Sequence, residues 1–346
     1  MHVRHLYIGL FLCGNNSIGD FIMIFILYFA LALLVILFSV KCADYVDLLD
    51  KKTHISGAFI GGIVLAAVTS LPELFTSLSS IFVVDNPELI IGNVLGSNVF
   101  NLAVFGTLIA FTSVHFSRSG VSTSHLATLI CSVAAYLGCA FAVWTGIGTL
   151  PGINLNIISI LIIVVYVISF RFLSGSDSET DESVDCKLTV RQIIFRFILM
   201  AIGLVVTSIF ITWATDQIAV KLNLNASLAG ALFLGIATSL PELTSSIALV
   251  RKRNYNAMIG NIIGSNMFNF TILSVADLLS WKESIYIGSS QTNLMLIFGV
   301  AASAATAVIL LLKRPKKEER YPRPWIYLVL SVIVVLCYLA FLILSV

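Results

Sequence analysis

The sequence predicts an all-α integral membrane protein in which ten transmembrane helices form two inverted repeats of five helices each. Three observations carry this prediction. First, 58% of the 346 residues are hydrophobic and 11% are charged, a balance typical of chains that cross a bilayer many times. Second, two polar motifs each occur once in each half of the chain. Third, the basic residues gather on one side of the resulting topology.

Ten apolar stretches account for the predicted helices. A helix needs about 20 mostly apolar residues to cross the hydrocarbon core of a bilayer. Stretches of this kind cover residues 20–40, 57–83, 89–111, 124–143, 153–173, 192–214, 226–250, 257–279, 288–312 and 325–345. Most connections between them are short, as is typical of bundled helices.

The basic residues set the predicted direction of the chain. Lys and Arg flank transmembrane helices mainly on the cytoplasmic side. If the N-terminus lies outside, all but three of the 20 basic residues fall inside or at inner helix ends, the exceptions being Arg4, Lys221 and Lys282. Because each half has an odd number of spans, the second half enters the bilayer the opposite way up. We therefore expect both termini outside a cell (plasma) membrane and the central linker in the cytoplasm.

The chain divides into three segments. Residues 1–173 form the first predicted repeat, and residues 192–346 form the second. Between them, residues 174–191 form a Ser-rich acidic linker, and segments of this composition stay solvated because they have little to bury. Residues 1–19 allow two interpretations, a short outside arm or a secretory signal.

One repeated motif places an acid inside an apolar span. Residues 69–74 read TSLPEL, and residues 238–243 repeat this unchanged. Thr69 and Ser70 precede Glu73 by four and three residues, so the three side chains share one helical face. Pro72 lacks an N–H and its ring obstructs the carbonyl four residues earlier, so the helix should kink or break beside the carboxylate. The second copy offers the same groups, which are Thr238, Ser239, Pro241 and Glu242.

The second repeated motif supplies amides and hydroxyls. Residues 92–101 read GNVLGSNVFN, and residues 260–269 read GNIIGSNMFN. In the first copy Asn93, Ser97 and Asn101 step by four and form one polar stripe, while Gly92 and Gly96 permit another helix to approach closely. The equivalent residues of the second copy are Asn261, Ser265, Asn269, Gly260 and Gly264.

Together the motifs predict a cation site lined by four helices near the middle of the membrane. Hydroxyl, carboxylate and carbonyl oxygens suit hard cations such as Ca2+ or Na+ and do not suit zinc or copper. Burying each carboxylate costs at least about 2.5 kcal/mol, and no Lys or Arg lies in the centre of a predicted span. A cation from outside the protein is therefore the natural partner of Glu73 and Glu242.

The remaining polar residues of the spans have more ordinary explanations. His125 and Asp277 have no counterpart in the other half, so we interpret both as packing or interface groups. Four asparagines could serve either as ligands or as hydrogen-bonding groups between helices. They are Asn93, Asn98, Asn261 and Asn266.

The paired motifs resemble the two alpha repeats of the cation/calcium antiporter superfamily, specifically its sodium/calcium exchanger branch. The resemblance implies that Glu73 and Glu242 coordinate calcium and that eight other residues complete sites for calcium and sodium. These are Thr69, Ser70, Ser97, Asn101, Thr238, Ser239, Ser265 and Asn269. In several exchangers the position of Asn269 is an aspartate, so this chain would carry two carboxylates instead of three. That difference leaves the sodium stoichiometry open.

The resemblance implies a secondary antiporter that expels cytosolic Ca2+ in exchange for Na+ by alternating access to a site near the midplane. Proton-coupled exchange through the same carboxylates is the first alternative, and a passive calcium channel is the second. An enzyme is not expected, because no nucleophile with its base and no phosphate-binding loop is present. The expected partners are the lipid bilayer and the transported ions, with no cofactor and no nucleic acid, and with function as a monomer.

Overall fold

A computed structural model describes residues 18–53, 67, 69–150, 155–173, 188–251, 253–280, 284–313 and 323–345. Helices make up the regular structure of these residues, apart from an isolated bridge between Thr149 and Asn156. The first half contains α2 (Ile18–Thr53), α5 (Leu71–Phe82), α6 (Glu88–Arg118), α7 (Ser124–Thr145) and α8 (Ile157–Leu173). The second half contains α9 (Val190–Leu222), α10 (Ala226–Ala229), the π-helical turn η2 (Gly230–Leu234), α11 (Gly235–Thr238), α12 (Leu240–Arg251), α13 (Tyr255–Leu279), α14 (Ser290–Leu312) and α15 (Pro324–Ser345).

The predicted all-helical membrane fold is confirmed. Seven of the described helices are long and apolar enough to cross a bilayer, and the bent pair Ala226–Thr238 and Leu240–Arg251 makes eight. α8 carries a shorter apolar stretch, Ile157–Ile168. The predicted span 57–83 lies partly outside the described residues, and residues 1–17 and linker residues 174–187 lie wholly outside them.

Several helices are longer than the predicted apolar spans. α2 continues to Thr53 and α9 to Leu222, although the predicted spans end at residues 40 and 214. Polar residues can extend a helix once it leaves the hydrocarbon core, because hydropathy limits only the part inside it. α9 also begins before residue 192, because the hydroxyl of Thr189 accepts from Gln192 N and the Gln192 side chain accepts from Thr189 N. This capping box fixes the start of the helix.

The second proline-containing motif interrupts its helix, as predicted, and a helix begins at the first. α5 begins at Leu71, with Pro72 in its first turn and Ser70 as the residue before it. In the second half, α11 ends at Thr238 and α12 starts at Leu240, with a bend of 43° between the two parts. A proline in the first turn of a helix needs no hydrogen-bond partner for its nitrogen, so the chain restarts there without penalty.

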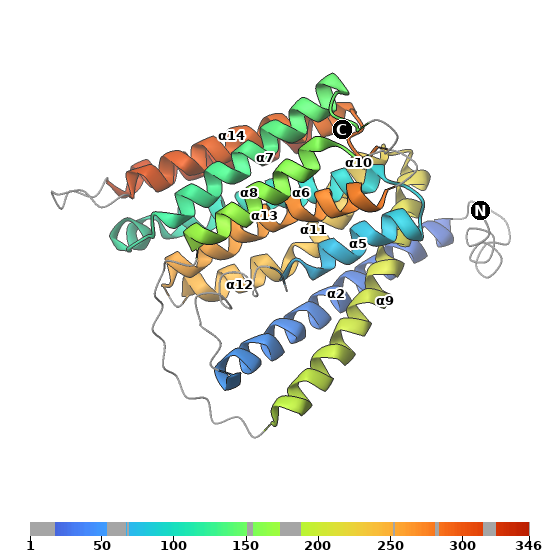
Figure 1. The fold of residues 1–346 in the computed structure, drawn as a ribbon, viewed down its shortest axis with the longest axis horizontal. Coiled ribbons are helices and arrows are strands. Elements are labelled where there is room, and N and C mark those ends of the chain that lie inside the picture. The colour runs from blue at the N-terminus through green and yellow to red at the C-terminus, as the bar shows by residue number, and fades with distance from the viewer. Residues whose placement is uncertain are drawn as a thin grey trace.

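The helices form a bundle around α6 and α13. In the most apolar stretch of α6, 72% of the residues are buried, and in that of α13 the share is 78%. In the most apolar stretch of α9 only 22% of the residues are buried. α6 packs against α13, α14, α15 and the segments α10 to α12. α2 and α9 lie side by side and make their most extensive packing with each other, at one side of the molecule (Figure 1). Polar side chains in the middle of α6 and α13 are therefore enclosed by the other helices.

The backbone of α6 lies in close contact with α10 and η2, and this contact joins the two halves of the chain. A Cβ placed on Gly92 would lie 2.1 Å from the carbonyl oxygen of Ser227, and one on Gly96 would lie 2.5 Å from Ala231 Cα. In the opposite direction, a Cβ on Gly230 would lie 2.6 Å from the Leu89 carbonyl oxygen. The predicted role of Gly92 and Gly96 as close-approach residues is confirmed, because no side chain fits between these backbones.

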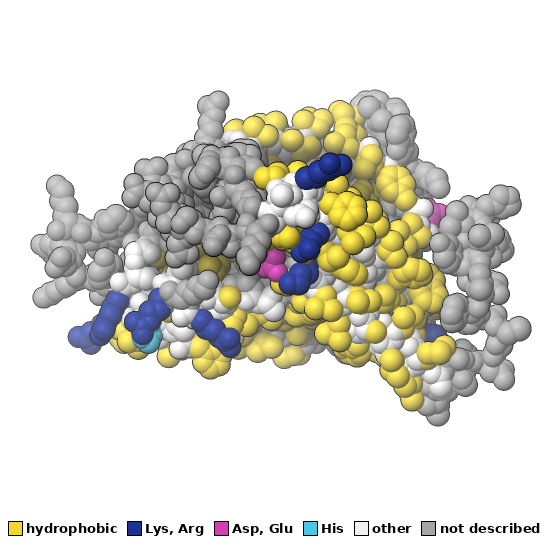
Figure 2. All heavy atoms as spheres, turned by 90° about the horizontal axis from the view of Figure 1, so that it is seen from below, with side chains coloured by type: hydrophobic (Ala, Val, Ile, Leu, Met, Phe, Trp, Pro, Cys, Tyr) yellow, Lys and Arg dark blue, Asp and Glu magenta, His cyan; other side chains and the backbone are white. Residues whose placement is uncertain are grey.

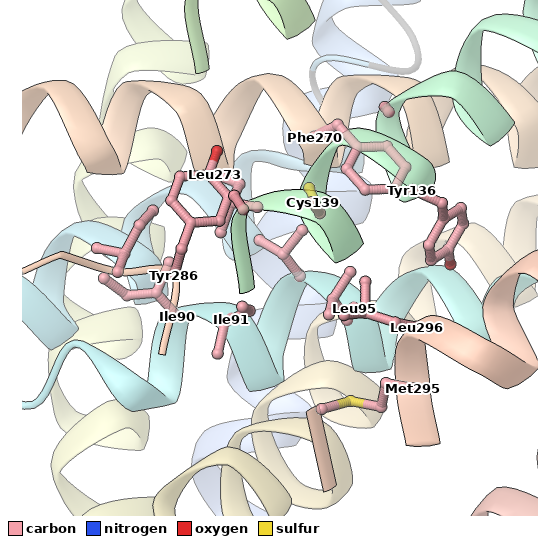
Figure 3. Packing of buried hydrophobic residues seen from close by; sticks show 14 of the residues in the cluster. Ile90, Ile91, Leu95, Tyr136, Cys139, Phe270, Leu273, Tyr286, Met295 and Leu296 are labelled. Atoms are coloured by element: carbon pink, nitrogen blue, oxygen red, sulfur yellow. The ribbon is translucent and has the colours of Figure 1, made fainter. Parts of the chain in front are cut away.

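Hydrophobic residues fill the interior and also cover the outside. One buried cluster joins α6, α7, α13 and α14 through residues such as Leu95, Tyr136, Phe270 and Met295 (Figure 3). On the outside, hydrophobic side chains cover much of the described part of the face seen in Figure 2. Phe195 of α9, for example, is 67% exposed. An apolar exterior of this kind suits lipid contact.

Candidate functional site

All ten side chains predicted as ion ligands are buried. None of these residues exposes more than 2% of its surface. They are Thr69, Ser70, Glu73, Ser97, Asn101, Thr238, Ser239, Glu242, Ser265 and Asn269. They come from the breaks before α5 and α12, from the first turns of those helices, and from the middle of α6 and α13.

The two glutamates lie at the junction of the halves, and each is held by the opposite half. Ser239 Oγ donates to Glu73 Oε1 over 3.1 Å, and Ser70 Oγ donates to Glu242 Oε1 over 3.1 Å. Ser70 precedes Glu73 by three residues, and Ser239 precedes Glu242 by three. The two TSLPEL motifs, 169 residues apart, thus meet and exchange hydrogen bonds through equivalent atoms.

The other predicted hydroxyls join the same assembly. Thr69 Oγ1 and Ser265 Oγ lie 3.4 Å apart, which connects the first break to α13. Ser97 Oγ donates to the Gly235 carbonyl oxygen over 3.1 Å, and this connects α6 to α11. Thr238 Oγ1, at the end of α11, donates over 2.8 Å to the carbonyl oxygen of Leu234 at the end of η2. The hydroxyls of Ser97 and Thr238 donate to backbone carbonyls, so lone pairs on these two oxygens remain for a cation.

Among the ten predicted ligands, four buried oxygens have no hydrogen-bond partner within the part of the chain that the structure describes. They are Oε2 of Glu73, Oε2 of Glu242, Oδ1 of Asn101 and Oδ1 of Asn269. An unpartnered buried acceptor costs roughly 1–3 kcal/mol, and more when it is charged. The four oxygens come in two equivalent pairs, one pair from each half. Two carboxylates and two amide oxygens that lack protein donors form the donor set that a hard cation requires.

Asn93 and Asn261 are two of the four asparagines that could be either ligands or hydrogen-bonding groups between helices. In the structure their NH2 groups bond to hydroxyls of the neighbouring helix. Asn93 Nδ2 lies 3.0 Å from Thr76 Oγ1 and 3.2 Å from Ser77 Oγ on α5. Asn261 Nδ2 makes the equivalent contacts on α12, 2.9 Å from Ser245 Oγ and 3.1 Å from Ser246 Oγ. These bonds fasten the helix that follows each break to its neighbour. The four hydroxyl partners were not predicted, since a Ser or Thr in an apolar helix has no sequence signal that names its partner.

The other two of these four asparagines, Asn98 and Asn266, each donate a hydrogen bond to the other's backbone carbonyl. Asn98 Nδ2 donates to the Asn266 carbonyl oxygen over 3.2 Å, and Asn266 Nδ2 donates to the Asn98 carbonyl oxygen over 3.0 Å. They therefore fix where α6 and α13 cross.

His125 and Asp277 form contacts between helices, in line with their interpretation as interface groups. His125 Nε2 lies 2.8 Å from Asn256 Oδ1, at the start of α13. Asp277 Oδ2 accepts from Asn156 N over 2.8 Å and from Ser159 Oγ over 2.6 Å, at the start of α8. A carboxylate at the beginning of a helix stabilises its unpaired N–H groups.

Lys313 is a buried cation that the sequence did not single out. It is 3% exposed, and its Nζ donates to the carbonyl oxygens of Phe116, Ser117 and Ser119 over 2.7, 3.2 and 2.6 Å. The ammonium also lies 4.8 Å from the centre of the Phe116 ring. Burial lowers the pKa of Lys313 to about 8, so the amine remains mostly protonated at neutral pH. It supplies a donor to the carbonyls of Ser117 and Ser119 at the end of α6, and a further donor to that of Phe116, which also accepts from Ser119 N.

We expect Lys313→Met to lower the free energy of unfolding by about 1–3 kcal/mol, because the carbonyls at the end of α6 lose their donor while the apolar stem is kept. Thermal unfolding of the purified protein in detergent measures this. Lys41→Met is the matched control, because Lys41 is 56% exposed and pairs only with Asp44 at the surface, where ion pairs contribute little. Equal effects of the two substitutions would contradict a special role for Lys313.

The fold and the site define an all-helical membrane protein with a buried cluster of carboxylate, hydroxyl and amide oxygens at the junction of its two halves. The family described as sodium/calcium exchanger protein matches residues 22–175 and, a second time, residues 193–346. The chain belongs to this family.

Two curated relatives extend the comparison. The inner membrane protein YrbG of Escherichia coli is 29% identical over 248 residues, which cover 70% of this chain and 75% of the relative. The sodium/calcium exchanger MaX1 of Methanosarcina acetivorans is 23% identical over 323 residues, which cover 82% of this chain and 90% of the relative.

Two solved structures have a similar fold. The H+/Ca2+ exchanger CAX matches with a TM-score of 0.63 and 15% identity, over 93% of this chain and 90% of its own. The sodium-calcium exchanger NCX_Mj matches with a TM-score of 0.55 and 22% identity, over 91% of this chain and 98% of its own. At these identities the likeness establishes the fold.

Proposed function

We propose that this protein is a calcium antiporter that exports cytosolic Ca2+ in exchange for Na+ entering down its gradient. The observation that carries the proposal is the set of four unpartnered buried oxygens, two of them carboxylate, contributed equally by the two halves. Two ionised glutamates balance the charge of one Ca2+. Sodium ions would use overlapping oxygens and compete for the same carboxylates. Bound Ca2+ must therefore leave before Na+ can bind, and the reverse.

We also propose ten transmembrane spans in two inverted five-helix repeats, with both termini outside and the linker in the cytoplasm. The double match of one family to residues 22–175 and 193–346 supports the repeat. The reciprocal bonds from Ser70 to Glu242 and from Ser239 to Glu73 support a pseudo-twofold axis through the site. Inverted repeats with interrupted helices at the midplane are a common architecture of secondary transporters.

α2 and α9 are the proposed moving elements, because they lead the two repeats and pack mainly against each other (Figure 1). Sliding of this pair against the ligand-bearing core would expose the site to one side at a time. We expect a single chain to be sufficient, because both halves of the site come from the same chain.

Proton-coupled calcium exchange is the second candidate. The similarity in fold to the H+/Ca2+ exchanger CAX, with a TM-score of 0.63, supports it. The same carboxylates would then carry protons in place of sodium. Both candidates place the exchange reaction at Glu73 and Glu242.

Calcium-45 uptake into proteoliposomes distinguishes the candidates. One set of vesicles is loaded with sodium, a matched set carries only a pH gradient, and a third set has neither. Uptake that requires internal sodium would support sodium/calcium exchange, and uptake driven by the pH gradient alone would support the proton-coupled candidate. Equal uptake in all three sets would indicate a passive pathway and would contradict an antiporter.

A further inference from the structure

The four asparagines Asn98, Asn101, Asn266 and Asn269 form a closed amide network between α6 and α13. Asn98 Oδ1 accepts from Asn269 Nδ2 over 3.0 Å, and Asn266 Oδ1 accepts from Asn101 Nδ2 over 3.0 Å. All four residues are at most 2% exposed. Each half contributes one amide of each kind, so the network has the same symmetry as the glutamate pair.

The network leaves one choice for the orientation of every amide. A backbone carbonyl only accepts hydrogen bonds, so the Asn98 atom that faces the Asn266 carbonyl at 3.2 Å must be its NH2 group. The oxygen of Asn98 therefore faces the other way. Since that oxygen also only accepts, the Asn269 atom facing it must be an NH2 group, and the Asn269 oxygen must point elsewhere.

In this orientation the side-chain oxygens of Asn269 and Asn101 receive no hydrogen bond from the network, and they are two of the four unpartnered oxygens described above. Asn269 Oδ1 and Asn101 Oδ1 are buried and have no hydrogen-bond donor. We infer that Asn98 and Asn266 are positioning residues, which turn the amide oxygens of Asn269 and Asn101 toward the transported cation and keep their NH2 groups away from it. This inference rests on the proposed function, because it assigns the two oxygens to the same ion site.

The same network explains why positions 101 and 269 carry amides. A carboxylate at position 269 would set an oxygen against Asn98 Oδ1 at the 3.0 Å now occupied by an N–H···O bond. Two facing acceptors repel, and neither is satisfied. Asn98 and Asn266 thus favour neutral donors at positions 269 and 101. The negative charge of the proposed site then comes from Glu73 and Glu242.

Double-mutant cycles on cation binding test the inference. The purified wild type and variants are titrated with Ca2+, Sr2+ and Na+, and the rise in unfolding temperature gives apparent affinities. We expect Asn269→Ala to weaken Ca2+ binding about tenfold and Asn98→Ala to weaken it by a similar factor. In the Asn269→Ala background, Asn98→Ala should add almost nothing, because the oxygen that it orients is already absent.

The crossed pair is the matched control. Asn101 is oriented by Asn266 and not by Asn98, so Asn98→Ala should keep its full effect in the Asn101→Ala background. The mirror prediction applies to Asn266→Ala, which should lose its effect only when combined with Asn101→Ala. A residue that merely holds α6 against α13 would weaken binding equally in both backgrounds, and this result would overturn the inference.

The outcomes separate this inference from the proposed function. In one outcome the wild type binds and transports Ca2+ while Asn98→Ala has the same effect in the Asn269→Ala and Asn101→Ala backgrounds. In that case the positioning role is wrong and the proposed antiporter is unaffected. If the wild type binds none of the three cations, the ion site itself is wrong and the inference fails with it. A variant that no longer folds is replaced by Asn98→Ser or Asn266→Ser, whose single hydroxyl cannot orient the neighbouring amide in the same way and which give the same cycles.

Discussion

Glu73→Gln and Glu242→Gln should each reduce calcium transport at least 100-fold, which corresponds to about 2.7 kcal/mol of lost binding. Glutamine can still accept the serine hydrogen bond that Glu73 or Glu242 receives from the opposite half. The fold should therefore survive. What changes is the second oxygen, which has no hydrogen-bond partner among the described residues. An NH2 group in its place removes one negative charge and directs hydrogens at the cation.

The measurement is calcium-45 uptake under the driving gradient that works for the wild type, together with cation-dependent thermal stabilisation in detergent. The two variants should behave alike, because their surroundings are equivalent. Asp277→Asn is the control, since Asp277 is also a buried acid with one unpartnered oxygen among the described residues, but its other oxygen accepts from Asn156 and Ser159 at the start of α8, apart from the two TSLPEL motifs. It should transport calcium at a rate close to that of the wild type. Normal transport by either glutamine variant would falsify the proposed site.

The sequence was sufficient to name the two acids that the fold buries together, because the cost of burying an acid can be judged without coordinates. Glu73 and Glu242 stand in apolar spans with no basic residue to pair with, and the repetition of their motif indicates that the two act together. The breaks at Pro72 and Pro241 were predictable for a similar reason. A proline without an N–H has a local effect that does not depend on the rest of the fold.

Features that depend on how distant helices cross could not be predicted. Nothing near Asn98 in the chain indicates that its amide faces Asn266, which lies 168 residues away. Lys313 likewise finds its carbonyl partners on a helix nearly 200 residues earlier. A polar side chain specifies how many hydrogen bonds it can make, but the tertiary structure decides with which atoms. The sequence could therefore name the candidate oxygens of the site but not which of them the protein leaves unpartnered.

Gly92→Ala should be among the most damaging single-methyl additions in the chain. Its Cβ would lie 2.1 Å from the Ser227 carbonyl oxygen, which is backbone and cannot rotate away. α6 must then separate from α10, and overpacking of this kind costs about 1–3 kcal/mol or more. Because α6 also carries Ser97 and Asn101, the separation displaces ligands of the site. We expect at least a tenfold loss of calcium uptake together with a lower unfolding temperature.

Gly96→Ala should have a similar but smaller effect, because its Cβ would meet Ala231 Cα at 2.5 Å. Gly120→Ala is the control, since a Cβ there would have no neighbour within 4 Å. Uptake and thermal unfolding of the three variants should rank in the order of these distances. Because the glycines carry no side-chain oxygen, a loss of transport would reflect the changed spacing between the two halves of the chain. Wild-type uptake by Gly92→Ala would mean that the junction between the halves is looser than the contact at Ser227 requires.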